Sequence, residues 1–169
     1  MEQNVDNKIE FKSKLDNFYN TNKIKIYAFF CILIILVIST IYIKINNEKK
    51  NALIAQKYIE AGLYLSSDQK EKSKNIYEEI ILSKNKFYSI LALYSIIEKD
   101  LITDQKKILN YFEIIEKIKK KDEQADIINF KKALYLIKSG NIDKGQLILR
   151  KLIENESKIK SLAEEIIIK

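Results

Sequence analysis

The chain has 169 residues, with 30 lysine plus arginine residues against 23 aspartate plus glutamate residues, so its formal net charge is +7. It contains no histidine, no proline, no tryptophan, three glycines and one cysteine, Cys31. Without histidine and with a lone cysteine, the chain lacks the parts for His-dependent catalytic triads, zinc sites and a disulfide framework. The scarcity of helix-breaking residues favours an all-α fold.

Residues 1–23 form a polar segment with a few apolar side chains at helical spacing. Phe11, Leu15, Phe18 and Tyr19 recur at i, i+4, i+7 and i+8. This spacing predicts a short amphipathic helix that lies on a membrane surface. A partly disordered tail is the alternative interpretation.

Residues 26–43 form an uncharged apolar run flanked by Lys25 and Lys44. As a helix the run is roughly 27 Å long, close to the thickness of the hydrocarbon core of a bilayer. We therefore predict a transmembrane signal-anchor helix over residues 24–45. A cleavable signal peptide is the alternative, but a long polar segment precedes the run and no small-x-small cleavage site follows it.

The lysines near the two ends of this run do not decide its orientation. The N-terminal side carries Lys8, Lys12, Lys14, Lys23 and Lys25, and the C-terminal side carries Lys44, Lys49, Lys50 and Lys57. Five against four is no bias under the positive-inside rule. The signal-anchor arrangement favours a cytoplasmic N-terminal segment and an exported C-terminal domain.

Residues 46–169 are long enough for one domain with its own core. Their apolar residues keep a helical period in seven blocks: 50–65, 69–83, 86–99, 104–120, 123–138, 142–154 and 157–168. Turn-forming residues separate the blocks, Thr103 and Asp104 are N-cap candidates, and Gly140 is expected in a left-handed conformation. Short connections predict that neighbouring helices pack antiparallel.

Two of these hairpins resemble the tetratricopeptide repeat. The matching positions are Ala133, Leu136, Gly145, Leu149 and Leu152 in one hairpin and Ala61, Tyr64, Ser73, Tyr77 and Ile80 in the other. An intervening hairpin around residues 92–112 fits loosely, because its turn at residues 99–103 is longer and lacks glycine. We predict an all-α protein with a short tetratricopeptide-like α-solenoid of about three helical hairpins plus a terminal helix. A three- or four-helix bundle is the alternative.

The sequence offers little chemistry for catalysis. The carboxylate pairs Glu78–Glu79 and Glu164–Glu165, and the cluster of Asp122, Glu123 and Asp126, are expected to be solvated faces, since adjacent residues on a helix point in different directions. No glycine-rich phosphate loop is present. We expect no enzyme, no cofactor, no metal and no small-molecule substrate. The basic run at residues 117–121 fits helix capping better than nucleic-acid binding, although basic residues close to the anchor could contact anionic lipid.

The layout as a whole resembles a known family. The segments that carry the resemblance are residues 8–30 at the entry to the membrane, 84–100 at the second hairpin and 126–152 at the third. They are similar to the YfgM-like ancillary subunits of the SecYEG translocon and to related membrane-anchored tetratricopeptide-like proteins of alphaproteobacteria. Compared with that family, a terminal hairpin is missing after the seventh helix.

The resemblance implies a single-pass protein of the bacterial inner membrane with a periplasmic domain. It also implies association with SecYEG and a membrane-anchored chaperone of the PpiD type, and a role in chaperone handover of exported proteins. The expected function is that of a protein–protein interaction module, with Tyr58, Tyr88, Tyr94 and Tyr135 as candidate protein-binding residues in a groove, or alternatively as core residues. An envelope assembly scaffold or a homo-oligomeric membrane organiser without an export role is the other hypothesis.

Overall fold

The computed structural model describes residues 3–118 and 124–167, and the side chains of these residues except 3–11, 13, 15, 16 and 26. Seven helices follow one another along the chain: α1 (Gln3–Ser66), α2 (Lys70–Leu82), α3 (Tyr88–Glu98), α4 (Gln105–Ile118), α5 (Gln124–Lys138), α6 (Ile142–Glu154) and α7 (Lys160–Ile167). The described residues contain no strand, so the predicted all-α class is confirmed.

Helix α1 is uninterrupted over 64 residues and contains both the predicted N-terminal segment and the predicted anchor. Its part Tyr27–Ser66 is long and apolar enough to cross a membrane by length and composition. The described large apolar side chains of the predicted span are exposed, for example Phe29 and Ile35 at 62% each. The predicted amphipathic stripe falls partly on side chains outside the described set; Phe18 and Tyr19 are exposed.

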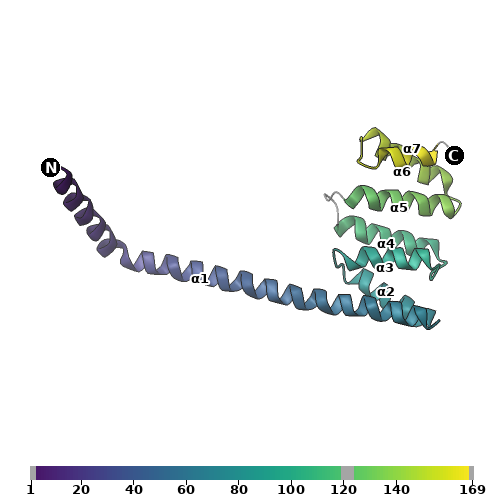
Figure 1. Ribbon diagram of the computed structural model, residues 1–169, viewed down its shortest axis with the longest axis horizontal. Helices are drawn as coiled ribbons and strands as arrows, with labels where there is room; N and C mark the ends of the chain where they lie inside the picture. The colour runs from purple at the N-terminus through teal and green to yellow at the C-terminus, as the bar shows by residue number, and fades with distance from the viewer. Residues whose placement is uncertain (1–2, 119–123, 168–169) are drawn as a thin grey trace. The chain divides into compact units, whose positions relative to one another are not determined.

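Contacts divide the chain into two units, residues 1–50 and residues 51–169. The second unit begins inside α1, so the last turns of this helix belong to the helical domain. In that unit consecutive helices pack against one another, and Figure 1 shows α3, α4, α5 and α6 side by side in chain order. The connections are short, as the sequence predicted, and neighbouring helices therefore run antiparallel.

Two clusters of buried side chains form the core of this unit. The first joins the end of α1 to α2, α3, α4 and the start of α5, and it includes Ala61, Ile80, Ile96, Phe112 and Ile128. The second joins α5, α6 and α7 and consists of Ala133, Leu149, Leu152 and Ala163. Since each cluster spans several helices, no single helical hairpin buries its apolar face alone.

The hairpins bury equivalent positions. The first buries Ala61, Ser73, Tyr77 and Ile80 and half-buries Tyr64; the second buries Leu93, Ile96, Ile108, Phe112 and Ile115; the third buries Ala133, Leu136, Gly145, Leu149 and Leu152. The second hairpin therefore follows the same pattern from Leu93. Its connection is three residues longer, because 15 positions separate Leu93 from Ile108 (108 − 93) and 12 separate Ala61 from Ser73 (73 − 61).

The backbone repeats with the side chains. A left-handed residue follows the first buried position of each hairpin by seven residues: 61 to 68, 93 to 100 and 133 to 140. Gly140 has φ +87°, as the sequence predicted, but the equivalent residues Asp68 and Asp100 have φ of 57° and 46° without being glycine. Lys84 and Glu156 end α2 and α6 in the same way.

The bounds of α2 to α7 agree with the predicted blocks within a few residues wherever the chain is described, but the predicted block 50–65 does not begin a helix, because it is the end of the continuous α1. Of the two N-cap candidates, Asp104 caps α4, because its Oδ1 accepts hydrogen bonds from the backbone N–H of Lys106 at 2.9 Å and of Lys107 at 3.3 Å. Residues 119–123, which include the end of the predicted 104–120 block, most of the basic run, Asp122 and Glu123, lie outside the described residues, as does residue 168.

The expectation of a solvated carboxylate face is wrong for Glu78 and confirmed for Glu79, whose side chain is 61% exposed. Glu78 and Glu79 were expected on a solvated face, but Glu78 is only 16% exposed and its Oε1 lies 2.5 Å from Lys107 Nζ on α4. Glu79 is more exposed and pairs with Lys57 on α1. Burial, followed by the nearby Glu78 carboxylate, raises the pKa of Tyr111 above its usual value. The two carboxylates therefore tie α2 to its neighbours.

Candidate protein-binding groove

The four tyrosines predicted to bind protein separate into two pairs. Tyr58 and Tyr88 are half-buried and pack on the first core cluster. The ring of Tyr58 lies 5.8 Å from that of Tyr88 and 5.5 Å from that of Tyr77, and its hydroxyl shares a hydrogen bond of 3.1 Å with the Ser95 hydroxyl. These contacts hold α1 against α2 and α3, so the core interpretation suits both residues.

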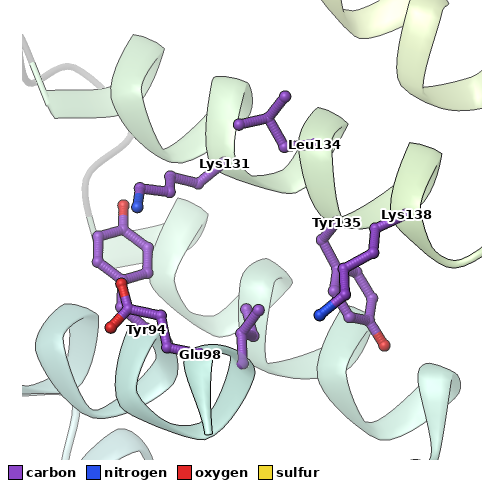
Figure 2. Close-up of a pocket in the computed structure, with 7 residues that line it drawn as sticks. Tyr94, Glu98, Lys131, Leu134, Tyr135 and Lys138 are labelled. Atoms are coloured by element: carbon purple, nitrogen blue, oxygen red, sulfur yellow. The ribbon is translucent and has the colours of Figure 1, made fainter. Parts of the chain in front are cut away.

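Tyr94 and Tyr135 line a groove between α3 and α5. The α3–α5 groove consists of two adjoining hollows that share Tyr94. One is lined by Tyr94, Ile97, Glu98, Lys131, Leu134, Tyr135 and Lys138, and the other by Phe87, Ile90, Leu91, Tyr94, Gln124, Ile127 and Ile128. Figure 2 shows the first hollow, with Tyr94 and Glu98 on one side and Lys131, Leu134, Tyr135 and Lys138 on the other.

The side chain of Lys131 reaches from α5 across to α3. Its Nζ lies 4.8 Å from the centroid of the Tyr94 ring, within the range of a cation–π contact. The Tyr94 hydroxyl is buried and has no hydrogen-bond partner among the residues that the structure describes. Burial raises the pKa of Tyr94 to about 12, because the phenolate would lose hydration.

At the other end of the first hollow, Tyr135 packs its ring 6.1 Å from that of Phe112 in the core. Burial raises the pKa of Tyr135, and the carboxylates of Asp104 and Asp100 raise it further. Lys138 is held by Asp100, with 3.3 Å between Nζ and Oδ1. The hollow therefore has an aromatic wall that packs on the core, one ion pair at its rim and one lysine in contact with an aromatic ring.

The second hollow is apolar and open to solvent. Phe87 is 57% exposed and Ile127 is 45% exposed, although both are large apolar side chains. Sequence reasoning did not single out these two residues or Lys131. The apolar sequence of α3 indicated that this helix contacts other groups on more than one face, but Phe87 precedes α3, and Ile127 and Lys131 lie on α5.

The groove has a mixed apolar and polar lining. Among the described residues no three Asp, Glu or Cys side chains gather as a metal site. The groove contains apolar side chains, a buried hydroxyl and a few charged groups at its rim, which is the composition of a surface that holds a peptide segment. Comparisons of the chain with protein-family models, curated proteins and solved structures found no match.

Proposed function

We propose that this chain is a membrane-anchored protein–protein interaction module. The observation that carries the proposal is the combination, in one chain, of an exposed apolar stretch of membrane-spanning length in α1 and a helical domain with an open apolar groove. Exposed large apolar side chains are unfavourable in water and favourable in lipid. The first feature accounts for anchoring, and the second accounts for binding.

The helical domain is proposed to be a short tetratricopeptide-like solenoid. The repeated burial pattern from Ala61, Leu93 and Ala133 supports this, and so does the left-handed residue seven positions after each of them. In a stack of hairpins the first helix of each pair contributes to a shared binding face. The α3–α5 groove lies between two such first helices.

The setting of the module follows from its resemblance to the YfgM-like family. On that basis the protein is a single-pass protein of the bacterial inner membrane, with residues 1–23 in the cytoplasm and the helical domain in the periplasm. The proposed partners are the SecYEG translocon and a membrane-anchored chaperone of the PpiD type. The module would bring the chaperone to exported proteins as they leave the channel.

A photo-crosslinking amino acid at Phe87 in the membrane-inserted full-length chain tests this proposal. Phe87 is exposed and lines the groove, so we expect it to capture a translocon subunit, an envelope chaperone or a polypeptide in transit. The matched control is Leu147 on α6, which is 54% exposed and does not line either hollow. Equal capture from both positions, or no protein captured from Phe87, contradicts the proposal.

An assembly scaffold or homo-oligomeric organiser is the second candidate. It is favoured by Ile59 and Leu63, which lie four residues apart on α1 within the helical domain and are each 63% exposed. Residues at this spacing share one face of a helix and suit a helix–helix contact. Crosslinks from Ile59 to a second copy, with none from Phe87 to another protein, would favour this function.

A further inference from the structure

Resting on the proposed function, we propose that the segment bound in the α3–α5 groove carries an acidic side chain beside an aromatic or branched aliphatic one. The carboxylate pairs with Lys131 and accepts a hydrogen bond from the Tyr94 hydroxyl. The apolar side chain enters the second hollow, between Phe87 and Ile127.

Lys131 differs from the basic side chains around it. Its neighbour on α5, Lys132, pairs with Glu116 at 2.8 Å, and Lys138 pairs with Asp100 at 3.3 Å. No ion pair of Lys131 occurs among the described residues; its ammonium lies over the Tyr94 ring. When a carboxylate binds, the ammonium can replace its weak cation–π contact with a stronger charge-assisted hydrogen bond.

The Tyr94 hydroxyl supplies the second polar group. Buried hydroxyls nearly always have a hydrogen-bond partner, and within the described part of the chain this one has none. Figure 2 shows the Lys131 ammonium at the hydroxyl end of Tyr94, with its Nζ 4.8 Å from the ring centroid, and the side chain of lysine is long and flexible. When Lys131 turns toward a bound carboxylate, one oxygen of that carboxylate can accept a hydrogen bond from the Tyr94 hydroxyl.

The apolar part of the ligand follows from the second hollow, which has no charged lining residue. Phe87 and Ile127 leave about half of their side chains in water. An aromatic or branched aliphatic side chain between them removes apolar surface of all three groups from water. A fully polar segment would gain nothing here.

Charge selects an acidic segment over a basic one. Residues 46–169 carry 24 lysine plus arginine residues against 19 aspartate plus glutamate residues, a net charge of +5 (24 − 19). The carboxylate of Glu98 also lines the first hollow, so a second carboxylate is best placed at Lys131 and away from Glu98. Electrostatic complementarity of this kind gives specificity and a salt-dependent association rate.

Peptide binding to the full-length chain in lipid nanodiscs tests the inference. The probe is a short fluorescent peptide with a phenylalanine flanked by aspartates, compared with analogues that carry asparagine or lysine for aspartate, or alanine for phenylalanine. We expect the aspartate peptide to bind about tenfold more tightly than the asparagine analogue, in a salt-dependent manner. The analogues with lysine for aspartate, or with alanine for phenylalanine, should bind more weakly than the asparagine analogue.

Variants assign the effect to the groove. Lys131→Gln should weaken binding of the aspartate peptide about tenfold and leave the asparagine analogue unchanged, whereas Lys131→Arg should retain the preference. Tyr94→Phe should weaken binding several-fold. The control Lys144→Gln alters an exposed lysine of α6 outside the groove and should change nothing. Near-UV circular dichroism checks that each variant is folded.

The result that overturns the inference is equal binding of the aspartate and asparagine peptides, or a Lys131→Gln variant that behaves like Lys144→Gln. If Phe87 then still captures another protein through a neutral or basic segment, the proposed function stands and only the acidic ligand is wrong. If no peptide binds and Phe87 captures only a second copy of the chain, both are wrong.

Discussion

Replacement of Gly145 by alanine tests the packing of the third hairpin. Gly145 lies in the first turns of α6, where this helix crosses α5. A Cβ atom at this position would lie 2.5 Å from Ile137 Cγ1, 2.7 Å from the Ala133 carbonyl oxygen and 3.2 Å from the Ile137 backbone nitrogen. Rotation of the Ile137 side chain can move its Cγ1 methylene, but the Ala133 oxygen belongs to the backbone of α5, so the two helices must separate.

The expected cost follows from two opposing effects. Overpacking of this kind destabilises a protein by about 1–3 kcal/mol, and more where backbone must move. Replacement of glycine by alanine in a helix stabilises the folded state by about 1 kcal/mol through helix propensity. Because two contacts are below 3 Å and one involves backbone, overpacking prevails, and we expect a net loss of about 1–2 kcal/mol.

Gly62→Ala is the matched control, since a Cβ at Gly62 would meet only the Tyr77 hydroxyl oxygen, at 3.9 Å. Here only the helix propensity changes, and we expect a gain of up to about 1 kcal/mol. The chain has 10 tyrosines and no tryptophan, so near-UV circular dichroism of the full-length chain in detergent follows the tertiary structure on heating. At about 4 °C per kcal/mol, Gly145→Ala should lower Tm by roughly 4–8 °C and Gly62→Ala should raise it. A Gly145→Ala protein as stable as Gly62→Ala would refute the close approach of α5 and α6.

Three further predictions concern helix ends and one buried tyrosine. Glu156→Gly relieves a left-handed φ of 50° and should raise stability by about 0.5–1 kcal/mol in the same melting experiment, whereas unchanged stability would contradict the strain. Asp104→Ala removes the cap of α4 and should cost about 1 kcal/mol, while Asp104→Asn should retain most of it. Burial raises the pKa of Tyr94 to about 12, above the ordinary value of an unfolded chain, so the protonated form stabilises the fold below pH 10 and this contribution is lost as pH rises toward 12. Tyr94→Phe should therefore make the melting temperature fall less steeply over that range, and an identical pH profile would contradict the burial of the hydroxyl.

The sequence was sufficient for the helices and for part of their packing. Amphipathic periodicity located the helices of the domain, because a helix that buries one face must repeat apolar residues near 3.6 positions. The small residues Ala61, Ala133 and Gly145 marked close approaches that the structure contains. The uncharged run at residues 26–43 similarly identified the stretch of α1 that suits a membrane.

The second hairpin was harder to place for a physical reason. Leu93 and Ile108 fill positions where its neighbours have Ala61 and Ser73, or Ala133 and Gly145. The larger side chains at these two positions and the longer connection between the helices obscured the small-residue pattern of the repeat, although the same positions are buried. The separator at residues 66–68 was predicted as a turn, but the left-handed conformation of Asp68 and Asp100 was not predicted, although aspartate is enriched in that region after glycine and asparagine.

The groove was only half predictable from the sequence. All four candidate tyrosines lie on apolar stripes: Tyr58, Tyr88, Tyr94 and Tyr135. Periodicity alone does not distinguish a tyrosine in the core from one that lines a groove. What separates Tyr94 is its position between two hollows and its contact with Lys131 from another helix. Such a contact depends on which helices become neighbours, and this information comes from the tertiary structure.

Alkaline carbonate extraction of membranes that contain the full-length chain tests most directly whether α1 holds the helical domain at a membrane. The apolar stretch within Tyr27–Ser66 should keep the whole chain in the membrane pellet, because carbonate removes peripheral proteins and leaves membrane-spanning helices in place. Recovery of the intact chain, or of a shortened chain that lacks residues 1–45, in the soluble fraction would contradict a permanent anchor.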